Sequence, residues 1–393
     1  MNMAAPRRAT KTQHDWLARE LTYWQSQGLI EPSAATTIRD GYEVSARFSL
    51  VKLALTLGGA FAGIGLIWLV AANLDELSPL LRIAIVVAFW LTSLAAIWWF
   101  DKRGQSTLGQ VAQGIAALAF GAVVMQTAQS LQVPAYEPKL LGVWALGALM
   151  LAYAVRGMAP LIVGIGTGIG WLEWYLGQHA HSVLPVVIGI LAAGVICATV
   201  ATLHGRWGPR SFAIPWRIAG AALSLVGLFV AAVPNTNLDQ ALWTTPAIVV
   251  AVLAGIVALV GYVLSGERGL KRFESTAAGL VMALGAVLVS WRVAGGEHLS
   301  VNDWAHSALA VVAFVAAAAW FASVAIMRES NLVMVISVVS LVAFVTFQSF
   351  AVFARLIQGG WLFVVLGAIF VATGFLADRG RRELAESLQG EQS

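Results

Sequence analysis

The residues of this chain with the greatest potential for chemistry are a few polar side chains inside long apolar stretches. Glu173, in the segment Trp171-Leu-Glu-Trp174, is the only acidic residue well inside such a stretch. Gln126 and Gln129 are three positions apart, which places them on one face of a helix. Polar groups are costly in hydrocarbon, so each is a candidate functional residue. A buried glutamate could relay protons or hold a cation, and the glutamines could line a polar pocket or permeation wall.

Each of these residues also has a purely structural interpretation. Gln126 and Gln129 belong to a polar stripe whose side chains could join neighbouring helices by hydrogen bonds. Glu173 could lie near the outer membrane interface, in an aromatic belt with Tyr175 and the flanking tryptophans that anchors its helix. The sequence alone leaves both interpretations open.

Signs of catalysis or metal binding are weak. Histidine and acidic side chains gather on one side of the predicted membrane, and such groups can form zinc sites. They are His179, His181, His298, His306, Glu297 and Asp303. Their spacing matches no compact metal motif, and the sequence has no phosphate-binding loop, no Gly-x-Ser-x-Gly and no pair of carboxylates placed for hydrolysis. We therefore expect no enzyme activity, no cofactor and no bound metal.

These polar residues stand out because the rest of the chain is apolar. Of 393 residues, 59% are hydrophobic and only 11% are charged, against roughly a quarter in an ordinary soluble protein. So few charges cannot cover a soluble surface, which excludes a soluble enzyme, a nucleic-acid-binding protein and a disordered chain. The single cysteine, Cys197, excludes an intrachain disulfide and a Cys-x-x-Cys motif. The composition indicates a polytopic membrane protein whose first partner is the lipid bilayer.

Long apolar runs predict an all-α, polytopic transmembrane helical bundle. A spanning helix needs about 20 mostly apolar residues to cross roughly 30 Å of hydrocarbon. The chain has about twelve such runs, at approximately 51–73, 80–100, 108–131, 139–156, 159–178, 184–204, 213–233, 244–264, 275–293, 304–326, 331–354 and 358–376. The loops between them are too short for a second folded domain. We expect a cytoplasmic amphipathic segment over 1–50, a bundle over 51–376 and a cytoplasmic tail over 377–393.

Lysines and arginines predict how the bundle is oriented. With a cytoplasmic N-terminus, 20 of the 24 fall on the cytoplasmic side, and Arg82, Lys139, Arg292 and Arg355 fall on the other. This asymmetry is typical of the positive-inside rule, so we expect a bacterial inner-membrane protein with both termini in the cytoplasm. A single missed span would scramble the alternation, but a missed pair would not, so ten spans also fit.

The charged N-terminal segment predicts a hairpin of two short helices. The first should run over about 14–27 and end at Gly28, a favourable C-cap. The second should be capped by Ser33 and carry Ile38 and Tyr42 on one face. So short a segment has no independent core, so it must pack on the membrane surface, on the bundle or on a partner.

Part of the sequence resembles a known family. The stretch from Gly58 to Asp75, Gly-Gly-Ala-Phe-Ala-Gly-Ile-Gly-Leu-Ile-Trp-Leu-Val-Ala-Ala-Asn-Leu-Asp, is similar to the first-span signature of a bacterial membrane family, domain of unknown function 2157. That family typically has a glycine-rich span leading into Ala-Ala-Asn-Trp-Asp, and here Leu74 replaces the tryptophan. The family's amphipathic segment before this span also resembles the chain at Trp24 and at Gly28-Leu-Ile.

A third element of the family is a glycine followed about eight residues later by Gly-Gln-x-Tyr. Gly121 and Gln129 fit this element, whereas Ala128 and Leu131 replace the second glycine and the tyrosine. The likeness covers roughly residues 15–175. The family has no settled activity, so the resemblance implies a membrane fold and no particular chemistry.

The resemblance directs attention to Asn73, Asp75 and Gln129, which the predicted topology places near the outer face. Asn73 could simply cap the end of the first spanning helix. Alternatively, the three residues could line an outward-facing polar pocket together with Gln126 and Glu173.

Three classes of function follow from the sequence. The first is a transporter or a permease for a small polar solute or a lipid, using the polar face near the first, third and fifth spans. The second is a non-transporting scaffold or sensor that docks a cytosolic protein through residues 14–47. The third, a membrane-embedded enzyme, has the least support because no acid–base or metal constellation is evident.

Overall fold

The computed structural model describes two units of the chain, residues 1–62 and 63–393, which we treat separately. The described residues are 7–9, 11–44, 78–134, 136–233, 242–291 and 300–348, with single positions at 58, 61, 65, 364, 367, 368 and 371. Asn73 and Asp75 lie outside the described residues. The same holds for nearly all of the predicted first and twelfth spans and for the C-terminal tail.

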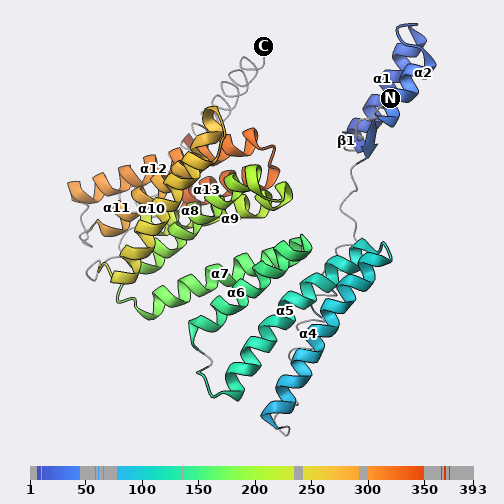
Figure 1. Cartoon of the computed structure of the whole chain (residues 1–393). Helices are drawn as coiled ribbons and strands as arrows, with labels where there is room; N and C mark the ends of the chain where they lie inside the picture. The colour runs from blue at the N-terminus through green and yellow to red at the C-terminus, as the bar shows by residue number, and fades with distance from the viewer. Residues whose placement is uncertain are drawn as a thin grey trace. The chain divides into compact units, whose positions relative to one another are not determined.

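The first unit contains two helices and a small strand pair, drawn in blue in Figure 1. Helix α1 spans Lys11–Ser26 and contacts α2, which spans Pro32–Asp40. Strand β1, Arg7–Ala9, pairs in parallel with β2, Tyr42–Val44. Gly28 follows α1 with φ of 71°, the left-handed conformation that glycine tolerates, which confirms the predicted C-cap.

Two detailed predictions for this unit are wrong. Helix α2 has Glu31 as its N-cap and Pro32 in its first turn, so Ser33 lies inside the helix and does not cap it. Proline suits this position because its missing N–H would have no helical partner there. Helix α2 ends at Asp40, so Tyr42 lies in strand β2 and not on a helix face with Ile38.

In the described part of the second unit, long helices match ten of the twelve predicted spans. They are α4 (Pro79–Lys102), α5 (Ser106–Ser130), α6 (Pro138–Val155), α7 (Met158–Gln178), α8 (Leu184–Trp207), α9 (Ala213–Ala232), α10 (Thr245–Leu264), α11 (Glu274–Ser290), α12 (Val301–Met327) and α13 (Asn331–Gln348). Two short 3₁₀ helices, η1 (Arg210–Phe212) and η2 (Gly269–Phe273), precede α9 and α11. Prolines lie in the first turns of α4, α6, α8 and α10, where they favour helix initiation.

Nine helices within the described ranges are long and apolar enough to cross a membrane. They include every helix from α4 to α13 except α7. Helix α7 has 21 residues, which is long enough to span, but it is not among these nine. The chain is therefore a membrane protein with several candidate spans, and the number twelve stays a prediction.

Hydrophobic packing divides the second unit into connected parts. A large apolar cluster joins α8 to α13, a smaller one joins α6 and α7 to α8 and α9, and a third joins α4 to α5. Helix α8 lies at the centre and contacts α7, α9, α10 and α11. In its most apolar stretch 72% of residues are buried, against 17% in α4. The exposed apolar faces of α4 and α10 fit a hydrocarbon surrounding.

Small residues bring α8 and α9 close together. A Cβ placed at Gly220 of α9 would lie 2.8 Å from the backbone nitrogen of Ala198 in α8. A Cβ placed at Gly194 of α8 would lie 2.6 Å from the Ser224 hydroxyl of α9. Larger side chains at either glycine would push the two backbones apart, a packing mode common between membrane helices.

Candidate functional site

Glu173 lies five residues before the end of α7 and turns its carboxylate toward α8. Both carboxylate oxygens are buried and have no hydrogen-bond partner among the described residues. A Cβ placed at Gly189 of α8 would lie 2.7 Å from Oε1 and 2.9 Å from Oε2. The carboxylate therefore occupies space that only a glycine at position 189 leaves open.

The surrounding side chains explain this orientation. Leu176, one turn after Glu173, is fully buried and also approaches Gly189. Trp171 and Trp174 are each 39% exposed, and the Trp171 ring lies against Gly142 of α6. Trp171 stacks on Tyr175, as expected for an aromatic belt. Helix α7 thus carries two partly exposed tryptophans close in sequence to a carboxylate whose oxygens are buried and unpartnered among the described residues.

The two glutamines predicted to line a pocket with Glu173 differ in their exposure to solvent. Gln126 of α5 is buried, whereas Gln129 of the same helix is exposed. Gln113, one of the same polar stripe, is buried, and its Oε1 has no partner in the described structure. Glu173 makes no hydrogen bond to either Gln126 or Gln129.

A polar pair, Tyr153 and His204, joins α6 to α8 near the opposite end of α8 from Gly189. The Tyr153 hydroxyl of α6 is 2.9 Å from Nε2 of His204 in α8, and Nδ1 of that ring is 2.6 Å from the Val200 carbonyl. Because Nδ1 must donate to a carbonyl, Nε2 of the neutral ring accepts from the tyrosine. Gly189 and His204 are 15 positions apart on α8, which corresponds to about 22 Å along the helix.

Along α8, Cys197 lies between Gly189, which faces the Glu173 carboxylate, and His204 of the Tyr153–His204 pair. It is 2% exposed and belongs to the apolar cluster that joins α6 and α7 to α8 and α9. Other members are Ala152, Leu161 and Ile165. The interface between the α6–α7 pair and the rest of the bundle is therefore apolar in the middle and polar at both ends.

Four charged residues that the sequence analysis did not single out as a site form the arginine–glutamate cluster: Arg217, Glu267, Glu274 and Arg328. Nε of Arg217 is 2.5 Å from Oε1 of Glu274. Nε and Nη2 of Arg328 are 3.0 Å and 2.8 Å from Oε2 of Glu274, and its Nη1 is 3.0 Å from Oε1 of Glu267. The side chain of Glu274 is 2% exposed. The cluster ties together the ends of α9, α11 and α12.

Charge complementarity explains why this cluster is tolerated at low exposure. A buried carboxylate needs paired charges and hydrogen bonds, and Glu274 has two guanidinium partners. Burial alone would lower the pKa of Arg328, but attraction to Glu274 and Glu267 outweighs it and raises that pKa above its ordinary value. The predicted topology places all four residues on the cytoplasmic side. Two features of the sequence could have revealed the cluster: all four residues lie on the same predicted side of the membrane, and Glu274 stands at the start of a predicted span.

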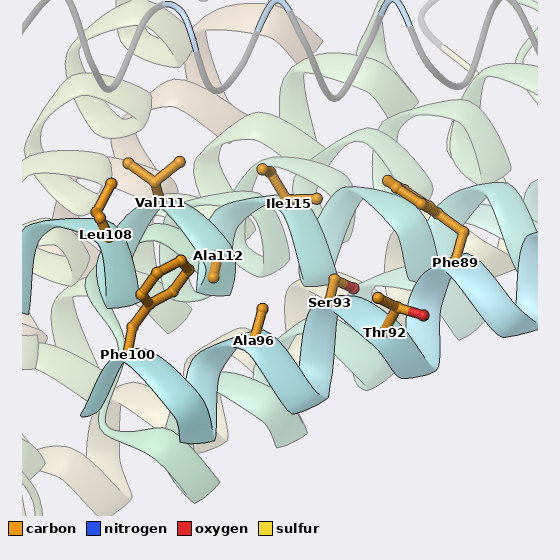
Figure 2. Close-up of a pocket in the computed structure, with 9 residues that line it drawn as sticks. All are labelled: Phe89, Thr92, Ser93, Ala96, Phe100, Leu108, Val111, Ala112 and Ile115. Atoms are coloured by element: carbon orange, nitrogen blue, oxygen red, sulfur yellow. The ribbon is translucent and has the colours of Figure 1, made fainter. Parts of the chain in front are cut away.

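An apolar groove of about 250 Å³ lies between α4 and α5. Figure 2 shows its lining, which consists of Phe89, Thr92, Ser93, Ala96, Phe100, Leu108, Val111, Ala112 and Ile115. The Thr92 and Ser93 hydroxyls donate to carbonyls of their own helix, Ala88 and Trp90. The groove therefore offers apolar surface, suited to an alkyl chain or a helix side and unsuited to a polar solute.

In the part of the chain that the structure describes, no group of three or more His, Cys, Asp or Glu residues could hold a metal ion. Asp303 forms a capping box with Ser300 at the start of α12. Nε2 of His306 lies 3.2 Å from the Leu288 carbonyl of α11. Both side chains thus serve helix packing and capping.

Comparison with known proteins identifies one family. Residues 22–161 match the family described as "Predicted membrane protein (DUF2157)". The match confirms the family resemblance over this segment, from α1 into the first turn of α7, while the roles of individual signature residues stay predictions. No curated protein and no solved structure matches the chain.

Proposed function

We propose that this protein is a non-enzymatic permease of the bacterial inner membrane that binds and moves a small polar solute. The matched family is a family of membrane proteins, and the described helices include nine candidate spans. The observation that carries the proposal is the unpartnered carboxylate of Glu173 at the α7–α8 contact. A contact that only packs helices gains nothing from an unpaired acid, because its charged form is costly there.

The solute path in this proposal follows the interface between the α6–α7 pair and α8–α9. Glu173 lies at the predicted outer end, the Tyr153–His204 pair lies at the predicted inner end, and Cys197 lies between them. If this interface opens at one end while the other end stays closed, Glu173 is exposed to one side of the membrane and the Tyr153–His204 pair, at another time, to the opposite side. The sequence-based hypothesis adds Asn73, Asp75, Gln126 and Gln129 to the outer pocket. Asn73 and Asp75 lie outside the described residues, and the two glutamines lie on α5, which contacts α6 and α7.

The chain carries its own reporter for this path, because Cys197 is its only cysteine. The full chain, reconstituted in liposomes, is exposed to a membrane-impermeant methanethiosulfonate. The liposomes hold or lack a gradient of each member of a panel of amino acids, sugars and organic anions. We expect Cys197 to be modified and to react faster under the gradient of a transported solute. Labelling is read by mass spectrometry.

A matched control places the thiol in the core of the bundle away from this path. Ala313 of α12 is 3% exposed and belongs to the large cluster of α8 to α13. A chain with Cys197→Ser and Ala313→Cys should stay unmodified under all conditions. If Cys197 is as unreactive as this control under every gradient, the interface does not open and the permease proposal fails.

A scaffold or sensor is the second candidate, and the first unit favours it. Trp16, Tyr23, Leu29 and Ile38 are large apolar side chains that are exposed on α1, α2 and their connection. Exposed apolar side chains of this kind are typical of a surface that meets a partner. In this alternative, residues 14–47 dock a cytosolic protein while the bundle stays closed. Copurification of a partner that is lost on deletion of 14–47, together with unreactive Cys197, would support it.

A further inference from the structure

We propose that Glu173 is a proton-binding site, whose carboxyl carries a proton while α7 lies against α8 and loses it when the two helices separate. This inference rests on the proposed permease function and extends it by naming the ion that binds at Glu173. The inference itself starts from the surroundings of one side chain.

Glu173 and Glu274 both carry carboxylate oxygens that are shielded from solvent, but their surroundings are opposite. Glu274 receives hydrogen bonds from two arginines, which favour its charged form. Glu173 has no donor for either oxygen in the described structure. A carboxylate without donors or countercharge is expensive to bury, and the neutral acid is the form that avoids this cost. The contrast predicts a charged Glu274 and a neutral Glu173 within one protein.

Among the described residues, the helices packed against α7 supply no countercharge near Glu173. Helices α5, α6, α8 and α9 contact α7. Helix α5 has no charged residue, α8 has none between Leu184 and Cys197, and α9 has only Arg217, which is bound to Glu274. On α6, Lys139 is exposed and pairs with Glu137 at 3.7 Å, and Tyr153 is bound to His204.

The remaining titratable groups follow Glu173 along the chain. They are Tyr175 and His179 in the last turn of α7 and just after it, and His181 in the connection to α8. Nδ1 of His179 is 2.8 Å from the Tyr175 carbonyl, and its ring packs 4.8 Å from the tyrosine ring. These groups form an exposed end of the helix through which a proton released by Glu173 could reach water.

The ligand is a proton, and a metal ion does not fit. Hard cations such as Mg²⁺ and Ca²⁺ take about six to eight oxygen ligands. This carboxylate shares the space beside Gly189 with a methyl group of Leu176, and no group of three or more His, Cys, Asp or Glu residues that could hold a metal ion occurs in the described ranges. A proton needs only one oxygen lone pair, so a lone carboxyl in an apolar setting suffices.

Reaction with a carbodiimide tests the protonation state directly. Apolar N,N′-dicyclohexylcarbodiimide adds a neutral carboxylic acid across one C=N bond. The acid proton moves to nitrogen and the carboxyl oxygen bonds to the central carbon, and this O-acylisourea rearranges to a stable N-acylurea on the glutamate. No oxidant or further reactant is needed. The full chain in liposomes is treated between about pH 5 and 9, and labelled peptides are measured by mass spectrometry.

We expect Glu173 to be labelled and Glu274 to remain unlabelled in the same sample. Labelling of Glu173 should fall about tenfold per pH unit once the pH passes the point of ionisation. It should not change when Na⁺ replaces K⁺ at constant ionic strength. Reaction only with a water-soluble carbodiimide would overturn the proposal, because the carboxyl would then be exposed. Protection by Na⁺ at constant pH would also overturn it, because the site would then hold a cation.

Glycine variants test the geometry. Gly189→Ala places a methyl group within 2.7 Å of Oε1, so it should displace the carboxyl and change the pH profile of labelling. Gly177→Ala is the control, because a Cβ at Gly177 meets nothing within 4 Å. An unchanged profile in Gly189→Ala would place the carboxyl elsewhere. Labelled Glu173 with an unreactive Cys197 would refute the permease and keep the proton site, and the reverse result would do the opposite.

Discussion

Arg217 and Glu274 are 57 positions apart in the sequence, yet Nε of the arginine lies 2.5 Å from Oε1 of the glutamate. The contact joins the first turns of α9 and α11. Arg328 binds the other oxygen of the same carboxylate from the end of α12. Glu274 thus connects α9, α11 and the end of α12 through Arg217 and Arg328. Glutamine has a similar shape, but it has only one side-chain oxygen and cannot accept from both arginines in the same way.

Glu274→Gln should therefore be strongly destabilising. It leaves the buried Arg217 without its anion and Arg328 with only its contact to Glu267, a loss of about 3–5 kcal/mol in the free energy of unfolding. Glu267→Gln is the matched control, because the Glu267 side chain is 26% exposed and contributes one partly solvated pair of about 1 kcal/mol or less. Thermal unfolding in detergent compares the two variants. Equal losses would show that Glu274 is not the centre of the cluster.

Two glycines of α7 predict opposite results for the same substitution. A Cβ at Gly164 would lie 3.0 Å from the backbone nitrogen of Leu149 in α6, whereas a Cβ at Gly166 meets nothing within 4 Å. Gly164→Ala should cost about 1–3 kcal/mol through overpacking. Gly166→Ala should be neutral or stabilise by up to about 1 kcal/mol through helix propensity. Thermal unfolding of both variants decides, and similar shifts would refute the close α6–α7 contact.

Orientation can be checked with single cysteines in a Cys197→Ser chain. Tyr136, between α5 and α6, and Arg268, between α10 and α11, are both exposed. The positive-inside rule predicts that Arg268→Cys reacts with an impermeant thiol reagent from the cytoplasmic side only. Tyr136→Cys should react from the opposite side only. Labelling of both from the same side of sealed vesicles would refute the predicted topology.

Gln129 offers a test of the predicted outer pocket. Because its side chain is exposed, Gln129→Leu should leave the free energy of unfolding nearly unchanged, within about 0.5 kcal/mol. If the residue contributes to solute binding, the same variant should abolish the gradient-dependent labelling of Cys197. Retained labelling would leave Gln129 with no role in the pocket.

Much of the fold follows from the sequence because a membrane helix is encoded locally. Ten predicted spans appear as helices, with prolines such as Pro79 and Pro138 in their first turns. The wrong predictions of a cap at Ser33 and of a helical Tyr42 show where local sequence is not sufficient. There, a competing proline and a partner strand distant in sequence decide the local structure, and no nearby pattern reveals them.

The candidate site was only partly predictable for a similar reason. Glu173 stands out in the sequence because an acid is rare in an apolar run. Its approach to Gly189 depends on how α7 and α8 rotate against each other, which packing decides. The arginine–glutamate cluster was missed because Arg217 and Arg328 were counted only as orientation signals, while Glu267 and Glu274 were not considered. Pairing across 57 positions appears only once the helices are assembled.

The arginine–glutamate cluster also sets an order for biogenesis. Glu274 is synthesised after Arg217 and 54 positions before Arg328. A nascent chain inserted up to α11 can form the first ion pair, while Oε2 of Glu274 still lacks its second cation. The translocating chain completes the charge balance only when the end of α12 emerges from the ribosome. A truncation before Arg328 would therefore leave Oε2 of Glu274 without the guanidinium that binds it in the full chain.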